Sequence, residues 1–326
     1  MATSRLSIIF FALSGTLTIL SGFEKARSQN ISHHVELEAN DNAQESFRSL
    51  GPAAEPVITT SIESCDAESS LSSYRNTEHE TEPQITVASL TIEGGSQLTQ
   101  KEQNQIEASI REHPYFGNVE RVTDDIFELL GEAWMNRGYL KAQVGGGSRV
   151  LSSLPMSSRI AVAARVDEGV QYRLDNISFR NNKAITNIEA LRGLFPIKDG
   201  EIATREKIAE GLENLRKAYQ EQGYINATFV PDSRFDDTEQ LVSFDIEVDE
   251  GKQFVITSIN LVAENESAAE TASKYLFVKP GEIYNRRLVS LFTKKYSIES
   301  PLIHLNDMEG TVDLTLDIRH CPLSVQ

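Results

Sequence analysis

The motif Val-Asp-Glu-Gly-x-Gln-aromatic occurs twice, in VDEGVQYRLDNISF at Val166–Phe179 and in VDEGKQFVITSINL at Val248–Leu261. The copies start at 166 and 248, 82 positions apart, and each contains a carboxylate pair. Paired carboxylates can hold a metal, but they also occur in polar turns. Glycine allows a turn with positive φ directly before the next strand. We therefore interpret both copies as short joints between successive domains, made by Glu168, Gly169, Glu250 and Gly251.

The segments around the motif repeat one order of elements: strand, helix, helix, strand, strand. Alternating apolar and polar residues predict half-buried strands at 85–95 and 172–182. This order predicts an α+β fold in which two helices cover a three-stranded sheet. We expect one such domain at 85–168, a second at 169–250 and a divergent third at 251–320.

Helix ends are marked in the first two units. A Thr-x-x-Glu pattern begins at Thr99 and again at Thr186, which predicts a capping box at each helix start. Gly138 and Gly223 follow the longer helices, each before a tyrosine. We expect the glycine to end the helix and the tyrosine to begin a strand.

The first 84 residues have a different composition. The apolar run Leu6–Phe23 predicts that residues 1–28 are a secretory signal peptide or a membrane anchor. Residues 29–84 are acidic, rich in Ser, Thr and Asn, and without sustained periodicity. We expect a disordered acidic linker there, because such a segment buries too little apolar surface to fold.

The charge and the motifs exclude several classes of function. A net charge of -17 with no basic stripe argues against binding nucleic acid or an anionic membrane surface. The sequence contains no Gly-x-Ser-x-Gly elbow, no His-Glu-x-x-His and no phosphate-binding glycine loop, so we expect no enzyme, no cofactor and no metal. His33-His34 and the loop aspartates Asp232, Asp236 and Asp237 are interpreted as solvated.

Taken in order, the first strand, the Gly-Tyr after the longer helix and the Val-x-Glu-Gly that closes the last strand resemble tandem POTRA domains of the BamA-like outer-membrane assembly superfamily. The resemblance covers residues 85–319. A family member of this type would continue into a membrane barrel, and the sequence shows no run of amphipathic strands of that kind, so we expect the arm without the C-terminal β-barrel.

The resemblance implies a periplasmic location, with association to the outer membrane or anchoring in the inner membrane through the N-terminal segment. It implies as partners unfolded, β-prone outer-membrane polypeptides, or a BamA-like barrel protein and its accessory subunits. An extended peptide can add to an open sheet edge through main-chain hydrogen bonds. We expect this edge in the second unit, at the predicted strand with Tyr224, Ile225, Ala227, Thr228, Phe229 and Val230.

Two alternatives stay open at this point. An anchored chain with a POTRA unit also resembles the FtsQ/DivIB family of cell-division scaffolds, although that family carries one such unit. The chain could also be the periplasmic arm of a split or truncated outer-membrane barrel protein.

Overall fold

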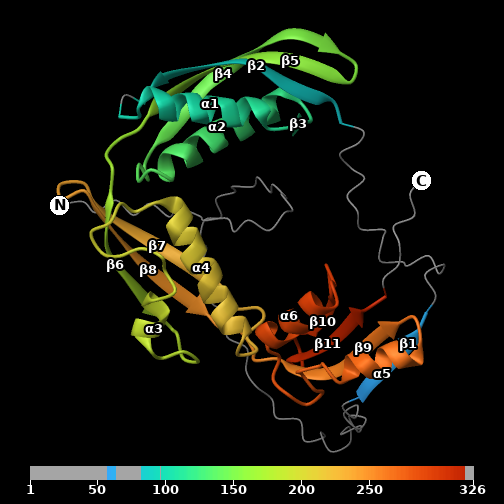
Figure 1. Ribbon diagram of the computed structural model, residues 1–326. Helices are drawn as coiled ribbons and strands as arrows, with labels where there is room; N and C mark the ends of the chain where they lie inside the picture. The colour runs from blue at the N-terminus through green and yellow to red at the C-terminus, as the bar shows by residue number, and fades with distance from the viewer. Residues whose placement is uncertain (1–56, 64–81, 96, 320–326) are drawn as a thin grey trace, which may run out of the picture.

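The computed structural model describes residues 57–63, 82–95 and 97–319. Three α+β units follow one another along the chain (Figure 1). The predicted signal peptide or anchor at 1–28 and the pair His33-His34 lie outside the described residues. Within the described part of the chain, no helix is both long and apolar enough to cross a membrane. The predicted domain boundaries stay predictions, and the units are called domains 1, 2 and 3 after their sheets.

Domain 1 is a four-stranded sheet with two helices on one face (Figure 1). Its elements are β2 (Gln84–Gly94), α1 (Gln100–Glu112), β3 (Tyr115–Phe116), α2 (Val119–Met135), β4 (Gln143–Leu154) and β5 (Ser157–Asp167). The strand order is β3-β2-β5-β4. β5 pairs parallel with β2 and antiparallel with β4, so the strand that comes last in the sequence of domain 1 lies inside its sheet.

Domain 2 has the same plan with three strands. Its elements are β6 (Arg173–Arg180), α3 (Ile188–Arg192), α4 (Arg205–Gln220), β7 (Thr228–Asp236) and β8 (Leu241–Asp249). The strand order is β6-β8-β7, with β8 parallel to β6 and antiparallel to β7. Both β6 and β7 are therefore edge strands in this sheet.

Domain 3 repeats the plan and gains a strand from the linker. Its own elements are β9 (Val255–Ala263), α5 (Glu266–Ser273), α6 (Arg286–Lys295), β10 (Leu302–Asn306) and β11 (Thr311–Asp317). The strand order is β1-β9-β11-β10, in which β1 (Val57–Ile62) pairs parallel with β9 (Figure 1). The third unit is thus complete, including β10, which the sequence pattern did not predict.

Each domain has its own apolar core between sheet and helices. The helices place one apolar face on the sheet, as their 3.6-residue periodicity predicts. Trp134 in α2 and Tyr219 in α4 are both fully buried, at corresponding ends of corresponding helices. Both large aromatic side chains are therefore core residues of their domains.

The expectation of a disordered linker at 29–84 is wrong for Val57–Ile62. Residues 29–56 and 64–81 lie outside the described residues, but the run VITTSI between them forms β1. Its β-branched residues favour an extended chain, and the open edge of β9 supplies the hydrogen-bond partners that the segment lacks locally.

Two local predictions also need correction. The first helix of domain 2 is capped by Asn187 rather than Thr186, whereas the capping box of Thr99 and Glu102 is present as expected. The strands after Gly138 and Gly223 begin at Gln143 and Thr228, since a turn of several residues follows each glycine.

Candidate functional site

The glutamate of the first motif copy closes domain 1. Glu168 Oε2 accepts a hydrogen bond from the indole Nε1 of Trp134 at 3.2 Å, and Oε1 accepts one from the backbone N of Gln97 at 3.2 Å. Both partners belong to domain 1. Gly169 follows with φ of 64°, which confirms the predicted turn with positive φ.

The second copy is built the same way. Glu250 Oε1 accepts hydrogen bonds from the backbone N of Ala184 at 2.7 Å and from the hydroxyl of Tyr219 at 3.2 Å. Burial, and then the charge of Glu250, raise the pKa of Tyr219, so the phenol stays a donor. Gly251 has φ of 63°. These contacts of the two glutamates tie each last strand to its own domain, and the glycines turn the chain into the next one.

The contact between domains 1 and 2 is made beside these turns, at Gly138. The backbone N of Tyr172 donates to Gly138 O at 2.9 Å, and Gln171 Nε2 donates to Arg137 O at 2.8 Å. A Cβ on Gly138 would come within 2.4 Å of Ile202 Cγ2, and its φ is +90°. This glycine therefore has a second task that its position after a helix did not reveal: it lets domain 2 approach closely.

The contact between domains 2 and 3 repeats this arrangement at Gly223. The backbone N of Phe254 donates to Gly223 O at 2.9 Å, and Gln253 Nε2 donates to Gln222 O at 2.9 Å. A Cβ on Gly223 would come within 2.5 Å of Ile283 Cγ2. The Gln-aromatic part of the motif and the Gly-Tyr at the helix end thus form one joint, used twice. These two sequence elements repeat together, and this repetition is the feature of the sequence that could have predicted the joint.

Polar side chains add to both joints. Lys141 Nζ and the hydroxyl of Tyr172 each lie 2.6 Å from Asp237 Oδ1, and Asn226 Nδ2 donates to Asp307 Oδ1 at 2.5 Å in the second joint. Hydrogen bonds from Lys141 and Tyr172 lower the pKa of the Asp237 carboxyl. Asp237 is 68% exposed in its hairpin loop, as expected, but it has a role that the sequence did not reveal, because Lys141 of domain 1 binds it across the joint.

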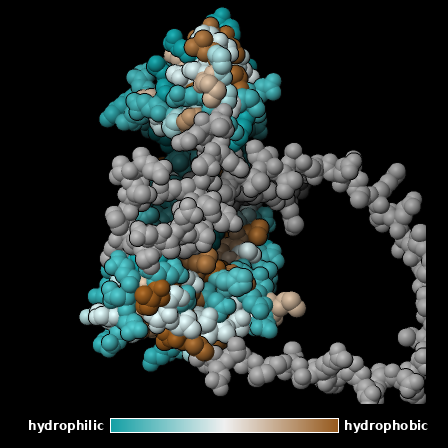
Figure 2. All heavy atoms as spheres, turned by 90° about the vertical axis from the view of Figure 1, so that its right-hand side faces the viewer, coloured by the Kyte–Doolittle hydropathy of each residue, from teal (hydrophilic) through white to brown (hydrophobic). Residues whose placement is uncertain are grey.

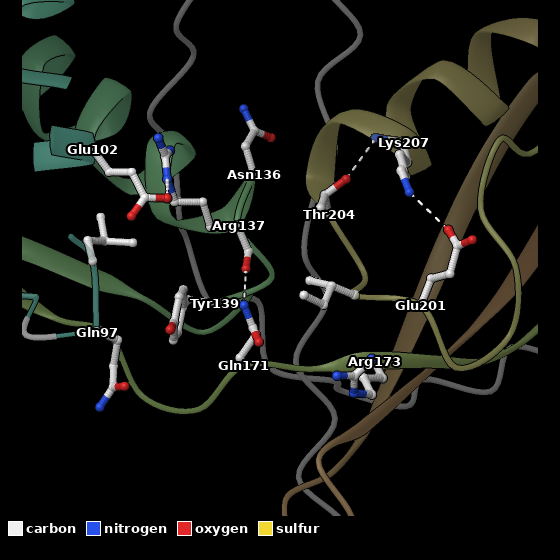
Figure 3. Close-up of a pocket in the computed structure, with 12 residues that line it drawn as sticks. Gln97, Glu102, Asn136, Arg137, Tyr139, Gln171, Arg173, Glu201, Thr204 and Lys207 are labelled. Carbon is white, nitrogen blue, oxygen red and sulfur yellow. Dashed lines mark hydrogen bonds and ion pairs between the residues drawn. The ribbon is translucent and has the colours of Figure 1, made fainter. Parts of the chain in front are cut away.

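A cleft of about 630 Å³ opens at the first joint, between the start of α4 and the end of α2 (Figure 3). Its charged side chains have partners within their own domains: Arg137 Nε lies 3.6 Å from Glu102 Oε1, and Lys207 Nζ lies 2.9 Å from Glu201 Oε2. Among the described residues, no group of three or more His, Cys, Asp or Glu side chains could hold a metal ion. The arrangement suits a joint between domains.

The predicted edge-strand residues divide into two groups. Thr228, Phe229 and Val230 begin β7, an edge strand, whereas Tyr224, Ile225 and Ala227 precede it in the turn. Ala227 is buried, Tyr224 packs against the ring of Tyr219, and Ile225 packs against the core of domain 3. As strand residues, the second three are a wrong prediction, because the turn after Gly223 directs them into the joint.

A second open sheet edge, in domain 1, was not predicted from the sequence. β4 of domain 1 occupies the same place in its sheet as β7, is 12 residues long and is exposed along most of its length. It exposes Val150, Leu151 and Leu154 at 47%, 47% and 68%. The glycine run at Gly145–Gly147 has a low strand propensity, so the sequence did not predict this strand well. Gly146 is needed there because a Cβ at this position would lie 2.0 Å from Ala163 O.

Comparison with known proteins identifies the fold of these units. A POTRA family model, described as surface antigen variable number repeat, matches residues 172–251, which is domain 2. The crystal structure of POTRA domains 3–5 of Haemophilus influenzae BamA is similar over 74% of this chain and 98% of that one, with a TM-score of 0.56 at 20% identity. At this identity the likeness shows the fold, and it extends over all three domains.

Two curated proteins are similar in sequence. A candidate outer membrane protein assembly factor of Treponema pallidum is 25% identical over 193 residues, covering 57% of this chain and 23% of the relative. The outer membrane protein assembly factor BamA of Buchnera aphidicola is 21% identical over 199 residues, covering 59% of this chain and 32% of the relative. The chain thus spans less than a third of either relative. It carries tandem POTRA domains of the kind found in BamA-like assembly factors.

Proposed function

We propose that this tandem POTRA array is a periplasmic scaffold in outer-membrane protein biogenesis, which binds unfolded outer-membrane polypeptides or assembly subunits by adding their extended segments to β7. The single observation that carries the proposal is that β7 has one open side: within the part of the chain that the structure describes, its partner in the sheet is β8 alone. Main-chain pairing along such an edge makes little demand on the sequence of the client. The proposed activity is binding, without a catalytic step, a cofactor or a metal.

Pro231 fixes which backbone groups of β7 face the open side. Proline has no N–H, so its nitrogen fits in a paired strand only on the side away from the neighbour. Backbone groups alternate in direction along a strand, so Phe229 presents its N–H and C=O to the same side as Pro231. The N–H of Phe229 is therefore the donor through which a client strand would begin to pair.

The other edge of domain 2 is less open than β7. The backbone N of Leu174 donates to Glu201 O at 2.8 Å, and Gly200 N donates to Leu174 O at 2.7 Å, so the start of β6 is already bonded by the chain that leads into α4. These two hydrogen bonds favour β7 as the binding edge, which is the edge expected from the sequence. The names of the two similar curated proteins, both assembly factors, support the same biological setting.

The location follows from the predicted signal or anchor at 1–28, which would take the domains across the inner membrane. Three successive domains with this fold argue against the division-scaffold alternative, because the FtsQ/DivIB family carries only one POTRA unit. The alternative that the chain is the arm of a longer or split assembly protein is compatible with the short share of the relatives that it spans.

The test compares Phe229→Pro with Phe229→Ala in binding to a labelled outer-membrane barrel protein diluted from urea. Both variants lose the packing of the Phe229 ring on Tyr219, whose centroids are 5.3 Å apart, but only proline removes the N–H. One lost main-chain hydrogen bond is about 1 kcal/mol, so we expect roughly five-fold weaker binding for the proline variant than for the alanine variant.

Equal affinity of the two variants would remove β7 as the binding edge. Absence of binding by the unsubstituted chain would remove the proposed function itself. Photo-crosslinking places the contact independently: a crosslinker at Val230, which is 62% exposed at the edge, should capture the client, whereas one on the outer face of α4 should not.

A further inference from the structure

The edge of β9 in domain 3 holds a strand that comes from far away in the sequence. β1 runs parallel to β9 from Val57 opposite Ser258 to Ile62 opposite Ala263, and the backbone N of Glu63 donates to Ala263 O at 3.0 Å. This is strand addition to a POTRA edge within one chain. It shows what the edge of β9 accepts.

Two side chains of domain 3 recognise the added strand. Asn260 Oδ1 accepts hydrogen bonds from the hydroxyls of Thr59 at 3.2 Å and Ser61 at 3.0 Å, so hydroxyl side chains at alternate positions converge on one amide. Glu63, directly after the strand, lies 3.0 Å from the guanidinium Nη1 of Arg319. The Arg319 side chain is only 4% exposed, so a carboxylate at this position meets a cation largely removed from water.

β1 itself adds almost nothing to the apolar core. Val57, Ile58 and Ile62 are 43%, 46% and 48% exposed, and the buried core of domain 3 consists of residues between Phe254 and Ile318. Figure 2, viewed from the side on which β1 lies, shows hydrophobic residues at the surface of this lower unit. The strand is therefore held by main-chain pairing and a few polar contacts, with little of the apolar burial that dominates the stability of a fold.

We propose that the edge of β9 is a docking site for an extended segment of a partner polypeptide, and that Val57–Glu63 occupies it in cis as a displaceable competitor. The partner segment runs parallel to β9, carries Ser or Thr at two alternate positions facing Asn260, and has an acidic residue two positions after the second of them to pair with Arg319. The proposal stands on the contacts of β1 and does not depend on client binding at β7.

Competition in cis sets the expected behaviour. A tethered strand acts at a high effective concentration, so a free peptide of the same sequence binds poorly while the tethered strand is intact. Weakening β1 by changes outside the domain 3 core should open the edge. Thr59→Ala, Ser61→Ala and Glu63→Ala together remove the three side-chain contacts and leave every residue of domain 3 unchanged.

The experiment uses the full chain with and without this triple substitution, and a fluorescent peptide with the sequence of residues 57–63, VITTSIE. Anisotropy should show about ten-fold tighter binding to the triple variant than to the unsubstituted chain. A matched peptide with valine in place of Thr59 and Ser61, the two residues that bond to Asn260, and glutamine in place of Glu63 should bind the triple variant at least about five-fold more weakly. Circular dichroism checks that the triple variant keeps its fold.

Three outcomes would overturn the proposal. The first is equal, weak binding of the peptide to both chains, and the second is equal binding of the matched peptide and VITTSIE to the triple variant. The third is a concentration-dependent dimer of the unsubstituted chain that disappears in the triple variant, which would assign the edge to β1 of a second copy. Loss of client binding in the Phe229 variants would leave these peptide results unchanged, so the two proposals fail separately.

Discussion

Domains 2 and 3 have the same fold but treat the edge of their first strand in opposite ways. The shared ladder aligns them, with Ile177 opposite Phe244 in one and Ile259 opposite Leu314 in the other. In this alignment Arg180 of β6 corresponds to Val262 of β9. Arg180 Nε lies 2.8 Å from Asp245, with its side chain 49% exposed, whereas Val262 is 6% exposed beside β1.

The difference shows that the chemistry of an edge decides whether a strand joins it. A charged side chain on an edge strand discourages pairing, because another strand would have to displace its water and its partners. Domain 2 carries such a charge on β6, and domain 3 has valine there and Asn260 two residues earlier. The residues that follow the last strands also differ. In domain 2, Glu250 accepts a hydrogen bond from Tyr219 of the same domain, whereas in domain 3 Arg319 forms an ion pair with Glu63, directly after β1.

The largest expected effect is in Arg319→Ala. The substitution leaves Asp317 and Glu63 without a cation that binds both, at 2.6 and 3.0 Å. Removing one partner of a buried ion pair is costly, and since these carboxylates are partly exposed we expect a loss of about 2 to 3 kcal/mol, at the low end for such sites. Urea unfolding followed by hydrogen exchange should place the loss in domain 3 and β1. Arg319→Lys, which keeps the charge, should recover part of it; an unchanged midpoint would refute the role of this pair.

The next effect is confined to domain 2. Glu250→Ala takes away the acceptor shared by the Tyr219 hydroxyl and the backbone N of Ala184. Leaving buried donors without an acceptor costs about 1 to 2 kcal/mol here, and Glu250→Gln, which keeps an oxygen, should cost less. Exchange should rise in domain 2 and stay constant in the core of domain 3. Equal destabilisation of both domains would mean that Glu250 holds the joint between them, as the sequence alone had suggested.

The repeated motif predicted the α+β units and the positive φ of Gly169 and Gly251, because both depend on residues close together in the sequence. The strand pairing of β1 could not be predicted in this way, since its partner lies about two hundred positions away and the run VITTSI stands in an acidic segment. The sequence also did not show that the predicted edge strand begins only at Thr228 and that Tyr224, Ile225 and Ala227 form a turn before it. Apolar residues in a turn that packs on a neighbouring domain have the same pattern as apolar residues of a strand.

A smaller effect tests the edge directly. Val262→Arg gives β9 the residue that β6 has at this position, on the face of the sheet away from the core. We expect amide exchange in β1 to rise about ten-fold, because the new charge disfavours a neighbouring strand, while the core of domain 3 keeps its protection. Val262→Thr, uncharged and of similar size, is the matched control. Unaltered protection of β1 in the arginine variant would break the comparison between the two edges.

The smallest effect is a pH dependence that domain 3 should show at β1. Although burial raises it, hydrogen bonds from Arg319 and the charge of Arg319 lower the pKa of Asp317 overall. A carboxyl whose pKa is lower in the folded state contributes its full stabilisation of the fold when the pH is above its ordinary pKa of about 4. This contribution is lost as the pH falls through the pKa of the folded state. Below about pH 4 the Arg319 cluster should therefore weaken and β1 should loosen before the domain unfolds. NMR shifts of the Thr59 and Asn260 amides between pH 7 and pH 3 measure this, and the amides of β6, to which no further strand is added among the described residues, serve as the reference. If the β1 amides move only together with those of β6 in global unfolding, the carboxylate cluster is not what holds the strand in place.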